Sequence, residues 1–173
     1  METAVADLES NPNTGGRILV TGGSGFIAQH LVGALVAGSR RVRILDIRPP
    51  RSTSPEVEYV AGSACDPHTV DKAMNGIDEV YHLAAIPSMW TMNKQDFVAA
   101  NYLSTKVMLA AAREHRITRF LHCSTESILF GRAQSEDLIT EETQISMDEM
   151  PGVYTRSKKA AEDLALRAAA EGV

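Results

Sequence analysis

The sequence predicts an α/β fold built on a doubly wound parallel sheet of at least five strands. Apolar runs of strand length alternate with segments of helical periodicity from residue 17 to the end of the 173-residue chain. Such alternation is typical of a parallel sheet with helices on both faces. A glycine-rich segment directly follows the first apolar run, and in these sheets ligands bind where strands end and helices begin. We therefore expect one domain over residues 16–173, after a flexible tail over residues 1–15.

The first strand, helix and second strand are predicted from apolar spacing and from the residues that end each segment. The run at 17–20 has the length of a short buried strand, and residues 25–37 repeat apolar side chains at helical spacing. Gly38 follows, and glycine is common just after a helix. A second strand is expected at 42–47, where two prolines stop it.

The next helix is predicted from a capping signal. A third strand, expected at 57–60, precedes it. Asp66 stands directly before Pro67, and this pair is typical of a helix N-terminus. The aspartate carboxylate accepts free backbone N–H groups, whereas proline has no N–H to leave unpaired. A helix is therefore predicted from here to about residue 76.

The second half of the chain continues the alternation. A fourth strand is expected at 79–83, a long helix at 96–114 and a fifth strand at 119–123. A polar, acidic loop is expected at 131–152. The last helix is predicted to begin near Tyr154 and to continue to the end of the sequence.

The glycine-rich turn is predicted to bind the pyrophosphate of a dinucleotide. A helix N-terminus offers an anion unpaired N–H groups and the positive end of its dipole. Gly22, Gly23 and Gly25 let a phosphate approach the backbone closely. Asp46 ends the second strand 21 residues after Gly25, where a carboxylate can accept hydrogen bonds from ribose hydroxyls. Asp46 favours NAD because it repels a 2′-phosphate, while Arg48 leaves NADP open as the alternative.

A tyrosine and a lysine one helical turn apart are predicted to carry proton transfer. Tyr154 and Lys158 are separated by four positions and can share one face of the last helix. A tyrosine ordinarily titrates near pH ~10. A neighbouring ammonium group would stabilise the phenolate and bring it into the range of acid–base catalysis. A hydroxyl that orients a substrate carbonyl is expected at the end of the fifth strand, where Ser124 and Thr125 lie.

Composition limits the classes of partner. The chain is 44% hydrophobic and 23% charged with a net charge of −5, and it has no basic stripe, so nucleic acid is not expected as a partner. No apolar run reaches the ~20 residues that span a bilayer and no secretory signal is visible, so no membrane partner is expected. Cys65 and Cys123 are expected to be reduced thiols of a cytoplasmic protein, without metal-ligand spacing.

Together these motifs resemble the extended short-chain dehydrogenase/reductase superfamily, in its epimerase/dehydratase and 3β-hydroxysteroid dehydrogenase-like group. The resemblance extends from residue 17 to the C-terminus. It is carried by T-G-G-S-G-F-I at 21–27, Asp46, V-Y-H-L-A-A at 80–85, Asn101, Ser124 with Thr125, I-T-E-E at 139–142, and Tyr154 with Lys158. It implies a Rossmann-type fold, bound NAD(H) or NADP(H), a small-molecule substrate, and a Ser/Thr–Tyr–Lys catalytic group supported by an asparagine.

The resemblance also implies individual site residues. The catalytic residues would be Tyr154, Lys158, Asn101 and a hydroxyl from Thr125 or, as the second choice, Ser124. Ser63 stands where the family often has an acid that contacts the adenine amino group. The residues implied at the cofactor are Gly22, Gly25, Phe26, Ile27, Asp46, Ile47, Ser63, Ala64, Leu83, Ala84 and Ala85, together with Tyr154 and Lys158.

We expect an NAD-dependent oxidoreductase that passes hydride between the nicotinamide and a secondary alcohol or ketone. Tyr154 would be the acid or base, Lys158 would lower its pKa, and Thr125 would hold the substrate oxygen. Two alternatives remain open: a sugar-nucleotide epimerase or dehydratase with tightly bound NAD, and a non-catalytic NAD(P)-sensing module. The intact pair of Tyr154 and Lys158 argues against the last.

The length of the sequence carries a further expectation. Members of this superfamily are usually much longer, so the C-terminal strands and most of the substrate region are expected to be missing here. The fifth strand would then lie near an open sheet edge, and the segment alone would associate and be inactive. The resemblance implies a homodimer for the full-length form, with contacts through the fourth and fifth helices.

Overall fold

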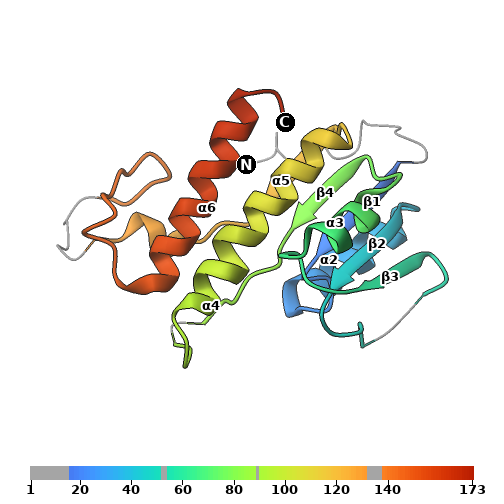
Figure 1. Ribbon diagram of the computed structural model, residues 1–173, viewed down its shortest axis with the longest axis horizontal. Helices are drawn as coiled ribbons and strands as arrows, with labels where there is room; N and C mark the ends of the chain where they lie inside the picture. The colour runs from blue at the N-terminus through green and yellow to red at the C-terminus, as the bar shows by residue number, and fades with distance from the viewer. Residues whose placement is uncertain (1–15, 52–53, 89, 132–137) are drawn as a thin grey trace.

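A five-stranded, wholly parallel sheet forms the centre of the computed structural model, which describes residues 16–51, 54–88, 90–131 and 138–173 (Figure 1). The tail expected at 1–15 lies outside the described residues. The strands follow the order β3-β2-β1-β4-β5, which is the Rossmann order, so the predicted fold class is confirmed. The strands are β1 (Arg17–Thr21), β2 (Arg41–Asp46), β3 (Val57–Ala61), β4 (Glu79–His82) and β5 (Arg119–His122).

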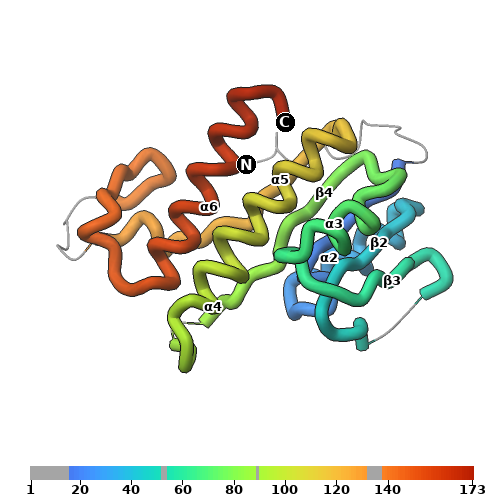
Figure 2. The backbone as a smooth tube through the Cα atoms, in the orientation of Figure 1, coloured from blue at the N-terminus to red at the C-terminus, as the bar shows by residue number. Residues whose placement is uncertain are grey.

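The helices cover both faces of this sheet. They are α2 (Phe26–Ala37), α3 (Pro67–Met74), α4 (Gln95–Phe97), the π-helix η1 (Val98–Leu103), α5 (Ser104–Glu114), the 3-10 helix η2 (Glu126–Leu129) and α6 (Gly152–Ala170). Helices α5 and α6 lie side by side, with α5 between α6 and the strands β1 to β3 (Figure 2). Within the described ranges, none of these helices is long and apolar enough to cross a membrane.

Two apolar layers hold the helices to the sheet. Successive side chains of a strand point to opposite faces. In β1, Leu19 therefore packs among residues of α3 and α5 such as Val70 and Met108. Its neighbours Ile18 and Val20 pack on the other face against α2. Both layers leave the carboxyl ends of the strands free to form a site.

Helix α6 is attached differently, through a mainly polar face. Its buried residues are Thr155, Ser157, Lys158 and Ala161. Three of these four carry hydrogen-bonding groups, so this helix depends on specific partners for its position. Those partners come from η1 and from the segment after β5.

The local capping predictions are confirmed, with one refinement at α2. Asp66 accepts hydrogen bonds from the backbone N–H groups of His68 and Thr69 at the start of α3. Gly38 caps the end of α2, and its N–H donates to the Ala34 carbonyl at 3.0 Å. Its φ of −80° is ordinary, and the left-handed residue is Ser39, with φ 60°.

The long helix predicted at 96–114 is interrupted by the π-helix η1. Two hydroxyls lie at the junction with α5: Ser104 donates to the Ala100 carbonyl at 2.6 Å, and Thr105 donates to the Asn101 carbonyl at 2.8 Å. Hydroxyls that bond to the carbonyl one turn back bend helices, and π-turns are frequent at functional sites. Asn101 is thereby buried, with 1% of its surface exposed.

Candidate active site

A cavity of about 690 Å³ lies at the carboxyl ends of the strands. This is the edge where open parallel sheets bind their ligands, and the volume is in the range of ligand pockets. Of the residues predicted for the site, the cavity is lined by Gly22, Gly25, Phe26, Ile27, Asp46, Ile47, Ser63, Ala64, Leu83, Ala84, Ala85, Ser124, Tyr154 and Lys158. Thr125 and Asn101 do not line it. Segments from the start and the end of the sequence thus meet at one cavity.

The glycine-rich turn is tied to both neighbouring strands. Gly22 has a φ of +66°, and a Cβ atom there would lie 2.8 Å from Cα of Ala84. The Gly22 N–H donates to the carbonyl of Leu45 at 2.9 Å, and the Gly25 N–H donates to the carbonyl of Gly22 at 2.9 Å. No side chain among the described residues caps the N-terminus of α2. The turn therefore has the backbone shape and the uncapped helix end that a pyrophosphate requires.

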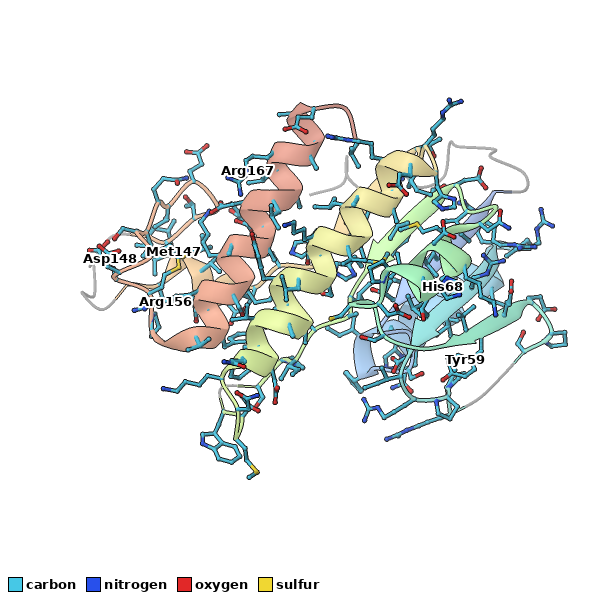
Figure 3. All side chains as sticks on the ribbon, viewed as in Figure 1. Tyr59, His68, Met147, Asp148, Arg156 and Arg167 are labelled. Atoms are coloured by element: carbon cyan, nitrogen blue, oxygen red, sulfur yellow. The ribbon has the colours of Figure 1, made fainter. Side chains whose placement is uncertain are left out.

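The Asp46 carboxylate is held in place by backbone donors. Its Oδ2 accepts from the Ser24 N–H at 3.0 Å, and its Oδ1 accepts from the Arg48 N–H at 2.9 Å. The hydroxyl of Tyr59, labelled in Figure 3, donates to the Asp46 carbonyl at 3.1 Å. Each carboxylate oxygen retains a lone pair for a further donor, such as a ribose hydroxyl. The Arg48 side chain is exposed and its residue also lines the cavity.

Helix α6 brings both Tyr154 and Lys158 to the cavity. The Tyr154 ring meets Phe97 edge-on, with ring centroids 5.9 Å apart. Lys158 is only 4% exposed, and its Nζ donates to the carbonyl of Cys123. Burial lowers the pKa of Lys158 from its ordinary value, against the opposing influence of Cys123 and Glu162. One face of α6 therefore brings a phenol and a buried lysine amine to the same cavity.

The two candidate hydroxyls, those of Thr125 and Ser124, have different surroundings. Thr125 caps η2, where its Oγ1 accepts from the Ser127 N–H, and it also bonds to the side chains of Glu126 and Ser127. Ser124 lines the cavity, and its buried Oγ has no hydrogen-bond partner among the described residues. A buried hydroxyl without a partner is rare unless a ligand or water uses it. Ser124 is therefore better placed than Thr125 to hold a substrate oxygen.

Asn101 lies behind the cavity wall. Its Nδ2 donates to Ser157 Oγ at 3.0 Å, and its Oδ1 accepts from the Ile86 N–H at 2.8 Å. It thus joins η1 to α6 and to the segment that follows β4. Asn101 does not itself line the cavity, but through Ile86 it positions a residue that does.

The buried His82 and the half-buried His122 stand at the ends of β4 and β5, and the sequence analysis assigned neither a chemical part. The rings of His82 and His122 are 5.7 Å apart. Burial and the nearby positive charge of Lys158 lower the pKa of His82 to about 3 and that of His122 to about 4. Both are neutral near pH ~7, so Lys158 supplies the positive charge at this end of the cavity.

Several residues that line the cavity were not among the predicted site residues. They are Ala28, Leu45, Cys65, Ile86, Pro87, Ala100, Ser104 and Cys123. Some carried a usable signal, because Cys123 directly follows β5 and Ile86 extends the segment after β4. Ala100 and Ser104 carried none, since they reach the cavity only through the π-turn of η1.

The Rossmann order of strands and the shared cavity define a domain of the extended short-chain dehydrogenase/reductase superfamily. The sequence model of the 3-beta hydroxysteroid dehydrogenase/isomerase family matches residues 19–172. The chain belongs to this family.

Individual relatives agree with this assignment. The chain is 34% identical over 161 residues to the 4-hydroxy-2-methyl-3-oxo-4-farnesyl-3,4-dihydroquinoline-1-oxide ketoreductase of Stigmatella aurantiaca, covering 90% of this chain and 47% of that protein. It is 32% identical over 126 residues to the human sterol-4-alpha-carboxylate 3-dehydrogenase, decarboxylating, covering 72% of this chain and 33% of the human protein. The chain thus spans between a third and a half of the length of these relatives.

Solved structures share the fold closely. MoeE5 in complex with UDP-glucose and NAD has a TM-score of 0.79 and 30% identity, covering 91% of this chain and 50% of that one. The UDP-glucose 4-epimerase of Thermus thermophilus in complex with NAD has a TM-score of 0.79 and 25% identity, covering 91% of this chain and 52% of that one.

Proposed function

We propose that the protein is an NAD-dependent oxidoreductase that interconverts a secondary alcohol and a ketone. The observation that carries this proposal is the single cavity lined by the glycine turn, Asp46, and the pair of Tyr154 and Lys158. The fit to a dinucleotide rests on the turn that excludes a Cβ at Gly22 and on the N-terminus of α2, which no described side chain caps, while the buried Ser124 hydroxyl without a partner among the described residues fits a substrate oxygen. The family and the NAD-bound neighbours support the same choice of cofactor.

In this proposal each residue has one task. NAD, when bound, supplies the hydride acceptor, and its pyrophosphate and ribose would be held by the turn at 22–25 and by Asp46. The Tyr154 hydroxyl exchanges a proton with the substrate oxygen, which Ser124 holds by a hydrogen bond. Lys158 stabilises the deprotonated phenol by its positive charge. A steady rise in NADH absorbance with a secondary alcohol, such as a 3β-hydroxysteroid, would support the proposal, whereas no NADH with any alcohol would contradict it.

A sugar-nucleotide epimerase or dehydratase is the second candidate function. It is favoured by the structural neighbours that hold a sugar nucleotide and NAD together. Such an enzyme regenerates its NAD within each turnover. Conversion of a UDP- or dTDP-sugar without net NADH, measured by chromatography of the products beside absorbance, would select this candidate over the first.

The protein is expected to bind NAD(H) more tightly than NADP(H). A 2′-phosphate would approach the buried Asp46 carboxylate, which repels it. Calorimetric titration of both cofactors should show a preference for NAD(H), and Asp46→Ala should reduce that preference by about tenfold. Arg48→Ala is the matched control and should leave NAD(H) binding unchanged. If the protein instead bound NADP(H) more tightly than NAD(H), and Arg48→Ala removed that preference, the assignment of NAD as the cofactor would be contradicted.

Ser124→Ala is expected to impair turnover more than Thr125→Ala. Ser124 lines the cavity and its buried hydroxyl has no partner in the described part of the chain, whereas the Thr125 hydroxyl is engaged in the η2 cap. Loss of a hydrogen bond to the reacting oxygen should lower kcat by about 10²-fold, while loss of the cap should mainly lower the melting temperature. Steady-state kinetics and thermal melts of both variants separate these effects. A larger loss of kcat in Thr125→Ala than in Ser124→Ala would assign the hydrogen bond to the substrate oxygen to Thr125 instead.

We also propose a cytoplasmic homodimer. The free thiols of Cys65 and Cys123 support a reducing compartment.

The exposed apolar side chains of Leu103 and Leu166, next to α5 and on α6, support association through these helices. Analytical ultracentrifugation of the protein and of Leu166→Glu tests the dimer.

A further inference from the structure

A chain of buried hydrogen bonds joins the glycine-rich turn to the helix that carries Tyr154, and His82 lies at its centre. On the cofactor side, His82 Nδ1 is 2.7 Å from Oγ1 of Thr21, the last residue of β1. The same Oγ1 accepts from the Ala84 N–H at 3.2 Å. Ala84 lines the cavity, and Thr21 directly precedes Gly22. This half of the chain therefore fixes the turn against the segment after β4.

The other half runs from His82 to α6. His82 Nε2 is 3.1 Å from Thr105 Oγ1, which donates to the Asn101 carbonyl. The Asn101 side chain donates to Ser157 Oγ at 3.0 Å, and Ser157 Oγ donates to the Tyr154 carbonyl at 2.7 Å. The side chains of Thr21, His82, Thr105, Asn101 and Ser157 are each no more than 5% exposed. Water therefore cannot readily replace any of these partners.

If all of these hydrogen bonds form together, their donors and acceptors can be assigned in one way only. Thr105 has a single hydroxyl hydrogen, which goes to the Asn101 carbonyl, so Thr105 Oγ1 accepts from His82. His82 Nε2 must then carry the proton, and Nδ1 is a bare acceptor. Thr21 donates its hydroxyl hydrogen to that Nδ1 and still accepts from the Ala84 N–H. Both ring nitrogens of His82 and both threonine hydroxyls then have partners, as a buried polar network requires in order to be stabilising.

We propose that His82, as its neutral Nε2–H tautomer, is a positioning residue that sets the spacing between the cofactor turn and the Tyr154 helix. It does so without touching the cavity, whose lining does not include it. The catalytic consequence rests on the proposed function, but the tautomer and the effect on NAD affinity do not. In the sequence, His82 is visible only as a letter of the V-Y-H-L-A-A stretch.

The charges around His82 favour the neutral ring. An imidazolium would present a second N–H to Thr21 and leave the threonine hydroxyl hydrogen without its acceptor. His122 at the end of β5 and Lys158 on α6 are the titratable groups whose charge acts on it, and Thr105 on the α5 side is uncharged. Burial is the larger influence and acts in the same direction, lowering the pKa of His82 to about 3, in agreement with the neutral ring that the bonds to Thr21 and Thr105 require.

Nitrogen NMR of the ¹⁵N-histidine-labelled protein tests the tautomer without any assay of activity. We expect His82 Nε2 to resonate as a protonated nitrogen and Nδ1 as an unprotonated one, with neither shift changing from pH ~5 to ~8. A protonated Nδ1, or a ring that titrates within this range, would overturn the proposal. Because this measurement uses the unaltered protein, it decides the point even where a variant fails to fold.

Three variants test the positioning role itself. His82→Phe removes both hydrogen bonds and should weaken NAD binding and lower kcat, each by about tenfold. His82→Gln restores a donor towards Thr105 and should recover part of the loss in kcat. The matched control His68→Phe, at an exposed histidine on α3 labelled in Figure 3, should change neither value. NAD affinity equal to wild type in folded His82→Phe, or equal impairment of the Phe and Gln variants in kcat, would overturn the proposal. If the unaltered protein binds NAD but turns over no substrate, the proposed function fails while NAD affinity still tests His82.

Discussion

Tyr154→Phe is expected to lower kcat by about 10³-fold while leaving the affinity for NAD almost unchanged. The substitution removes only the phenolic oxygen, so the ring can keep its edge-on contact with Phe97 and α6 keeps its place. The glycine turn and Asp46 belong to other elements and are not disturbed. Steady-state kinetics combined with calorimetric NAD titration measures both expectations on one preparation.

The matched control for this substitution is Tyr102→Phe. Tyr102 lies in η1 and does not line the cavity, so its loss of a hydroxyl should leave kcat within about twofold of wild type. Substantial residual turnover in Tyr154→Phe would mean that another group exchanges the proton with the substrate.

Gly22→Ala is expected to have the largest effect on cofactor binding. The residue has a φ of +66°, and an added Cβ would lie 2.8 Å from Cα and 2.9 Å from N of Ala84. Backbone atoms cannot swing aside as a flexible side chain can, so the turn or the segment after β4 must move. We expect a loss of about 1–3 kcal/mol in the free energy of unfolding and at least a roughly tenfold loss in NAD affinity.

Gly33→Ala makes the same chemical change where the structure has room for it. Gly33 lies inside α2, and apart from its chain neighbours and the nearby backbone of its own helix no described atom lies within 4 Å of the Cβ it would gain. Alanine is a better helix former than glycine by about 1 kcal/mol, so this variant should be more stable than wild type and should bind NAD normally. Urea denaturation and NAD titration of both variants complete the test. Equal stability and equal NAD affinity of Gly22→Ala and Gly33→Ala would contradict the assignment of the turn at 22–25 to the cofactor.

Elements set by local interactions could be predicted from the sequence. The capping of α3 depends on Asp66 and the N–H groups of His68 and Thr69, and every predicted strand lies within one residue of its observed bounds. The π-helix could not be predicted, because the Asn101 side chain bonds to Ser157, 56 positions away. Arg43 is a second such case. It lies in the apolar strand β2 but is buried through bonds to Glu58 and to the carbonyls of Ala73 and Asn75.

The residues of the candidate site also fall into two groups: those that the local sequence predicts and those that depend on the folded backbone. Residues in motifs of fixed spacing, such as Gly22, Asp46, Tyr154 and Lys158, were placed from the sequence at what the structure shows to be one cavity. The order of Ser124 and Thr125 could not be found by counting along the chain. It depends on which of the two hydroxyls caps η2 by a hydrogen bond, and this 3-10 helix is known only from the folded structure.

The polar attachment of α6 has a consequence for how the domain responds to heat. An apolar face tolerates small rotations and slides, since hydrophobic contact has no direction. Directional bonds from Ser157 and Lys158 allow one rotational setting of the helix, but they contribute little to the cohesion that apolar burial gives the strands. The helix that carries Tyr154 is therefore held in one orientation, but only a small free energy holds it against the rest of the domain. On warming it should detach as a separate opening unit before the sheet melts, so that chemistry is lost at a lower temperature than the fold.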